Sequence, residues 1–108
     1  MANQEHLDIL KQGQEKWKDW RRKSPKIQPD LRNANLSSAH LNGIAFSKAN
    51  LFGTDLRSAA LVGAYLMRAT LCKANLSEAN LRRANLSEAN LSGANLTRAL
   101  QLHLFPHQ

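Results

Sequence analysis

The sequence predicts an all-β solenoid, a quadrilateral β-helix of about 3.5 coils with an N-terminal α-helical cap. Two observations predict the solenoid. A large apolar residue returns at every fifth position, 14 times in succession, and alanine stands two residues before it in 11 of the 14 units. The recurring residues are Leu31, Leu36, Leu41, Phe46, Leu51, Leu56, Leu61, Leu66, Leu71, Leu76, Leu81, Leu86, Leu91 and Leu96.

A period of five fits neither an α-helix nor a flat strand. On a helix, successive leucines would drift by about 140° and line no single face. On a strand, an odd period would place them on alternate sides. The period fits a short extended unit that ends in a corner, with the leucine and the residue two before it pointing inward. Four corners close a square of 20 residues, and coils stacked about 4.8 Å apart pair their backbones.

Residues 1–28 are expected to form the helical cap and lead-in. Apolar residues recur at helical spacing within residues 4–23, which predicts one helix with Asn3 as its N-cap and Ser24-Pro25 at its end. An open coil end exposes backbone edges and leucines, so it needs a cover. We expect a structural cap made by Leu10, Trp17 and Trp20, and the alternative is a ligand site built on the tryptophans.

Residues 29–98 form the predicted solenoid. Alanine at the inward corner position avoids overpacking. The residue between the alanine and the leucine points outward and is Asn or Asp in 9 of 14 units, as suits a tight turn in which the side chain bonds nearby backbone.

Units such as Ala74-Asn75-Leu76-Ser77-Glu78 resemble those of the pentapeptide-repeat proteins. The resemblance covers residues 29–98 and implies a right-handed quadrilateral β-helix. Gyrase-protecting members of that family resemble B-form DNA and have acidic surfaces. This chain has a formal net charge of +7, so gyrase-type DNA mimicry is not expected.

Residues 99–108 form an apolar tail in which the five-residue register fails, since Gln101 stands at the next leucine position. Two alternatives stay open: the tail folds over the last coil, or it joins two molecules in a homodimer. Gyrase-protecting members of the family join two chains through a C-terminal element. The candidate dimer tail comprises Leu100, Leu102, Leu104 and Phe105.

No converging set of catalytic groups is evident, so the protein is expected to have no enzymatic activity, cofactor or metal. Asp30 and Asp55 occupy turn positions, His40 has no obvious partner, and Cys72 is the one cysteine. The other histidines, His6, His103 and His107, do not form a metal-ligand spacing with Cys72.

The basic residues are densest near the end of the predicted helix. Lys16, Lys18, Arg21, Arg22, Lys23 and Lys26 stand against Asp19 alone. They are either a solvated helix face or candidate contacts for an anionic partner, nucleic acid included.

Departures from the repeat pattern cluster between residues 40 and 72. Among the outward positions, Phe52, Val62, Tyr65 and Met67 form a candidate partner patch, and neutral variation is the alternative. The predicted function is a non-enzymatic scaffold for protein–protein interaction, with an unidentified partner. The alternative is a basic nucleic-acid-binding module that uses the Lys16–Lys26 run. No run is long and apolar enough for a membrane span and the N-terminus is polar, so a cytoplasmic location is expected.

Overall fold

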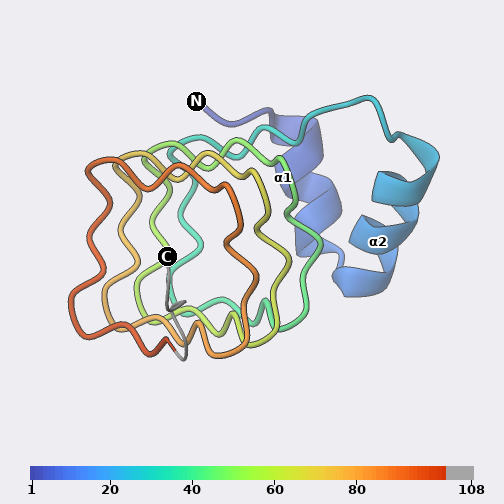
Figure 1. Ribbon diagram of the computed structural model, residues 1–108. Helices are drawn as coiled ribbons and strands as arrows, with labels where there is room; N and C mark the ends of the chain where they lie inside the picture. The colour runs from blue at the N-terminus through green and yellow to red at the C-terminus, as the bar shows by residue number, and fades with distance from the viewer. Residues whose placement is uncertain (102–108) are drawn as a thin grey trace.

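The computed structural model describes residues 1–101. Helices α1 (Gln4–Lys11) and α2 (Gln14–Lys23) lie side by side against the N-terminal part of a stack of square coils (Figure 1). The coils contain no strand longer than an isolated bridge residue within this part of the chain.

The expectation of one continuous helix over residues 4–23 is wrong. α1 ends at Lys11, and Gly13 adopts a φ of +108°, a conformation that a helix cannot continue through. Both predicted ends are confirmed: the side chain of Asn3 accepts a hydrogen bond from the His6 amide, and α2 stops at Ser24.

Parallel bridges join residues that stand 20 apart in the sequence, from Asp30 with Asn50 to Asn80 with Leu100. The Leu36 amide donates to the Asp55 carbonyl at 2.8 Å, and the Asp55 amide donates back to the Ala34 carbonyl at 2.9 Å. Each coil therefore bonds to the next through short parallel ladders, and one coil takes 20 residues, as the square path requires.

A tight turn ends each five-residue unit. At the corner after Leu56, Ser58 has a φ of +58° and the Ala59 amide donates to the Leu56 carbonyl at 3.1 Å. The corner residue is glycine at four places in the solenoid and an ordinary L-residue at ten. Since L-residues rarely adopt this conformation, the stacking of the coils must hold them there.

The core is the axis of the stack. The leucines from 51 to 76 have no exposed surface, and the residue two before each of them, an alanine in every case except Thr54, is buried beside them. Leu86, Leu91 and Leu96 in the last coil are only half-buried. The leucines on the axis are thus fully buried in the middle of the stack and covered by the helices at the N-terminal end, and they are less buried toward the C-terminus.

Candidate interaction surfaces

Side chains of α2 bond the backbone edge of the first coil. The Trp17 indole Nε1 donates to the Ala45 carbonyl at 2.8 Å, and the Arg21 guanidinium donates to the carbonyls of Ala45 at 2.6 Å and Ser47 at 2.9 Å. Gln14 Nε2 donates to the Asn42 carbonyl at 2.7 Å. The cap therefore satisfies backbone acceptors that no earlier coil can reach.

The next coil shows which donors the cap replaces. There, the Tyr65 carbonyl accepts from the Phe46 amide and the Met67 carbonyl accepts from the Lys48 amide. Ala45 and Ser47 are the equivalents of these residues one coil earlier, where no amide is available. An indole N–H and a guanidinium supply the missing donors, because an unpaired carbonyl at this edge would cost free energy.

α1 bonds another point of the same edge. The Asp30 amide donates to His6 Nδ1 at 3.0 Å, and the Asp30 carbonyl accepts from the Asn3 amide at 3.0 Å. An aromatic cluster packs beneath: the ring centroids of His6 and Trp20 lie 4.7 Å apart, and those of Trp17 and Phe46 lie 5.7 Å apart edge to face.

The three residues predicted as the structural cap lie in or beside this contact. Trp17 is fully buried, Leu10 is buried and Trp20 is half-buried against the core. The histidine and arginine of the contact were missed by the sequence analysis, since nothing in their spacing distinguishes them from surface residues.

The predicted basic run divides into three groups. Arg21 is bound to backbone carbonyls, and burial lowers the pKa of its guanidinium. Arg22 and Lys23 both pair with Asp19, and hydrogen bonds from Lys23 and then Arg22 hold the pKa of that carboxyl below its usual value. Lys16, Lys18 and Lys26 are exposed. The structure therefore separates Arg21 from the candidate anionic-partner contacts, because its donors serve the first coil.

The solenoid carries four carboxylates, and each pairs with an arginine. Two pairs lie within one turn, Asp30 with Arg32 and Asp55 with Arg57, and two join consecutive coils, Arg68 with Glu88 and Glu78 with Arg98. Hydrogen bonds from Arg32 and Arg57 lower the pKa of the Asp30 and Asp55 carboxyls. Both aspartates are thus turn residues bound to arginine.

The candidate partner patch spreads over three faces of the square. Tyr65, 51% exposed, and Met67 lie on one face. Val62 lies on the face before it and Phe52, 38% exposed, on the face after it. Cys72 stands one coil beyond Phe52, because the Gly53 amide donates a hydrogen bond to the Cys72 carbonyl. The side chain of Cys72 is half-buried.

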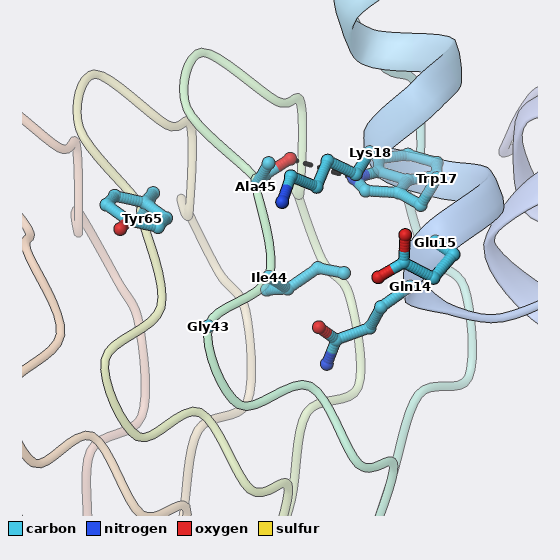
Figure 2. Close-up of a pocket in the computed structure, with 8 residues that line it drawn as sticks. All are labelled: Gln14, Glu15, Trp17, Lys18, Gly43, Ile44, Ala45 and Tyr65. Carbon is cyan, nitrogen blue, oxygen red and sulfur yellow. Dashed lines mark hydrogen bonds between the residues drawn. The ribbon is translucent and has the colours of Figure 1, made fainter.

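A groove lies between α2 and the face that carries Tyr65 (Figure 2). Figure 2 shows Lys18 and Gln14 reaching from α2 over the coil at Gly43 and Ala45. The lining residues are Gln14, Glu15, Trp17, Lys18, Gly43, Ile44, Ala45 and Tyr65. The groove could not be foreseen from the sequence, because it lies between α2 and a coil that is far from it along the chain.

Other predicted residues lie apart. His40 is exposed at the first coil. Among residues 1–101 no three His, Cys, Asp or Glu side chains come close enough together to hold a metal ion. Leu100 is 45% exposed, and the remaining residues of the candidate dimer tail, Leu102, Leu104 and Phe105, lie outside the described residues.

The repeat matches a known family. The model of the family described as pentapeptide repeats matches residues 30–66 and 64–100, with eight copies. This chain belongs to the pentapeptide-repeat family. Its members form right-handed β-helices, so the predicted family and the general fold class are confirmed.

Solved structures similar to this pentapeptide-repeat chain include three that are described as pentapeptide-repeat proteins. HetL of the cyanobacterium Nostoc sp. strain PCC 7120, described as involved in heterocyst differentiation regulation, is 32% identical over 65% of this chain and 44% of its own, with a TM-score of 0.49. Rfr23 of the cyanobacterium Cyanothece 51142 is 36% identical over 70% and 63%, with a TM-score of 0.42.

The third is a thylakoid-lumen protein of Arabidopsis thaliana, 30% identical over 68% of this chain and 55% of its own, with a TM-score of 0.35. The chain spans less than two thirds of the length of each of these three proteins. The search of curated proteins finds no match. In the described part of the chain, neither helix has the length and apolar character needed to cross a bilayer.

Proposed function

We propose that this pentapeptide-repeat protein is a non-enzymatic scaffold that binds another protein through the candidate partner patch, which spans three adjoining faces with Tyr65 and Met67 on the middle one. The observation that carries the proposal is the exposure of large apolar side chains on a solenoid whose other outward positions are mostly polar. Phe52 and Tyr65 are exposed although a repeat of this kind needs no apolar residue there. Adjoining exposed apolar residues are typical of contact surfaces.

The test is affinity capture from native lysate, with the bound proteins identified by mass spectrometry. Met67→Ser combined with Phe52→Ser removes apolar surface without touching the axis, so folding should persist and a specifically captured protein should be lost. The matched control is Arg57→Ser with Thr97→Ser on the opposite face, which should leave capture intact. Equal capture by all three proteins would overturn the proposal.

Binding of nucleic acid is the second candidate, and the exposed Lys16, Lys18 and Lys26 favour it. Duplex and single-stranded DNA should then shift in electrophoresis, and the shift should weaken steeply as salt rises. Lys16→Glu with Lys26→Glu should abolish the shift. Arg21 is unsuitable for this test because its substitution would also break bonds to the first coil.

For the ends of the molecule we propose a homodimer formed through the C-terminal end, supported by the exposure of Leu100 and the half-buried leucines of the last coil. Light scattering should give about twice the 12.1 kDa chain mass, and a mass near the single chain would refute the dimer. We also propose that the fourteen units make about 3.5 coils, which the 20-residue bridge spacing supports. A cytoplasmic location and the absence of catalysis stay predictions.

A further inference from the structure

We propose that the groove between α2 and Gly43, with the adjoining corner surface at Gly63, binds an extended acidic peptide segment that carries an apolar side chain. This inference rests on the proposed scaffold function and names the chemistry of its partner. It concerns the groove lined by α2, Gly43, Ala45 and Tyr65, together with the corner surface at Gly63, one coil further along the stack.

The corner at Gly43 and Gly63 is bare. A Cβ added at either glycine would meet no atom within 4 Å, so the space beside both is open. The other corners carry side chains or close neighbours: Lys48 and Arg68 follow each other at one, and a Cβ at Gly53 would meet the Asn33 side chain. Among the four corners, this is the one with glycine in consecutive coils.

Apolar side chains flank the bare corner on both sides. Tyr65 is 51% exposed on one side, next to half-buried Ala45 and Met67, and half-buried Val62 lies on the other. An apolar side chain placed over the glycines would contact Tyr65 and Val62 together. Such burial supplies the main gain of free energy in most protein associations.

Cations stand at both ends of the surface formed by the groove and the corner at Gly63. Lys18 extends from α2 above Ala45, and Arg82 and Arg83 stand in the coil after Val62 and Gly63. No ion pair engages these three within residues 1–101, and every carboxylate of the solenoid is already bound to another arginine. Glu15 is the acidic residue that lines the groove. The charge therefore favours an acidic ligand.

The spacing suits an extended chain. Three consecutive coils separate the first and last corner positions, Gly43 and Arg83, by about 10 Å, since coils stack about 4.8 Å apart. An extended peptide covers that distance with about three residues. The backbone of these coils is already paired, as in the Gly43–Val62 and Gly63–Arg82 bonds at 2.8 and 2.9 Å, so recognition must come from side chains.

The experiment selects ligands from a displayed library of random dodecapeptides, using the full chain as bait. Selected peptides should be enriched in Asp and Glu around one apolar or aromatic residue. A fluorescein-labelled selected peptide is then titrated in anisotropy measurements against the wild-type protein and its variants.

Two variants with the same new charge form the matched pair. Gly63→Glu places a carboxylate on the corner surface beside the groove, and Ser58→Glu places the same side chain at another corner of the same coil. Both should fold, since Glu78 and Glu88 occupy corners at φ of +62° and +60°. We expect affinity to fall about tenfold or more for Gly63→Glu and to change little for Ser58→Glu.

Two further variants test the charge. Arg82→Ala with Arg83→Ala should weaken binding by about fivefold, and Glu15→Gln should tighten it by about twofold, because it removes the opposing carboxylate. Tyr65→Ser should weaken binding by about tenfold through lost apolar contact.

Three outcomes would overturn the proposal: no enriched peptide, enrichment of basic peptides, or equal affinity of the Gly63→Glu and Ser58→Glu proteins. A DNA oligonucleotide bound in a way sensitive to Gly63→Glu, without acidic peptide binding, would also overturn it. If the Gly63→Glu protein still captured the same lysate protein, the groove would be refuted as its binding site and the scaffold function would stand. If neither an acidic peptide nor a lysate protein were captured, both the groove proposal and the scaffold function would be refuted.

Discussion

The residue before each leucine shows how the turn chemistry is built. Asn75 Oδ1 accepts from the Ser77 amide at 3.0 Å and from the Ser77 hydroxyl at 2.7 Å. Asp55 makes the same bond to the Arg57 amide at 3.2 Å and also binds the Arg57 guanidinium. Asn and Asp therefore share one geometry, and the aspartate adds a charge that its arginine neutralises.

This difference predicts a pH dependence for Asp55. Its pKa is lowered by the hydrogen bond from Arg57, so the pair stabilises the folded state above the ordinary carboxyl pKa, and that stability is lost as the pH falls through the lowered value. Asp55→Asn keeps the turn bond and removes the charge. The urea midpoint of the variant should therefore fall less than that of the wild type between pH 5 and about pH 2.

Asn75→Ala is the control for this measurement. It removes an uncharged turn acceptor, so it should lower the urea midpoint by a similar amount at every pH. If Asp55→Asn showed the full acid dependence of the wild type, the ion pair would have no part in stability.

Departures at the inward positions follow a second rule at the residue scale. Thr54 replaces an alanine and is fully buried, and its hydroxyl donates to the Leu31 carbonyl at 2.8 Å. Phe46 replaces a leucine and meets Trp17 edge to face. A larger side chain is tolerated at an inward position where it makes a hydrogen bond or packs against the cap.

At the scale of the element, α2 substitutes for a missing coil. Its indole and guanidinium donors occupy the places that backbone amides fill elsewhere along the solenoid. The charged surface of the helix is a separate feature, since Lys16 and Lys18 are exposed while Arg21 faces the coil. One helix thus covers the coil and borders the groove.

Trp17→Phe tests the bond that the indole makes. The ring volume is largely kept, but the donor to the Ala45 carbonyl is lost, so the free energy of unfolding should fall by about 1–2 kcal/mol. Trp20→Phe is the control, because within residues 1–101 its indole donates no hydrogen bond. Equal losses in urea unfolding would show that ring volume, and not the bond, decides the stability.

At the scale of the whole molecule, the core is uneven along its axis. Leu66 in the middle of the stack is fully buried, whereas Leu91 in the last coil is half-buried. In a solenoid each coil contacts only its neighbours, so the stability of a coil depends on the two that flank it. The C-terminal end should therefore open more readily than the middle.

A pair of truncations measures this gradient. Leu66→Ala should cost about 2–5 kcal/mol, because it leaves a cavity between coils, whereas Leu91→Ala should cost less than half as much. Urea unfolding monitored by far-ultraviolet circular dichroism, which reports on all the coils, gives both values. Equal costs would contradict the half-buried state of Leu91 and show that its side chain is as well covered as the middle of the stack.

The solenoid followed from the sequence because its signal is local and repeated. Each leucine, alanine and asparagine acts within one unit or between neighbouring coils, so a period of five implies the corners and the inward stripe. The cap was anticipated in outline, yet its division into two helices was not. The break lies at Gly13, whose φ of +108° no periodic pattern of apolar residues indicates.

The candidate site was harder to foresee for the same physical reason. The exposure of Tyr65 could be expected from its position in the repeat, because alternation assigns it to the outside. The backbone bonds of Arg21 and the open space beside Gly43 could not, since they depend on where α2 lies.

By itself the sequence determined the family, the five-residue path and the outward apolar positions, because a side chain that is buried once in every unit recurs at a fixed interval along the chain. Only the tertiary structure decided which cations stay uncommitted, how the first coil satisfies its carbonyls and where a groove opens. Those features arise between segments far apart in the chain, where contact depends on three-dimensional packing and leaves no periodic trace.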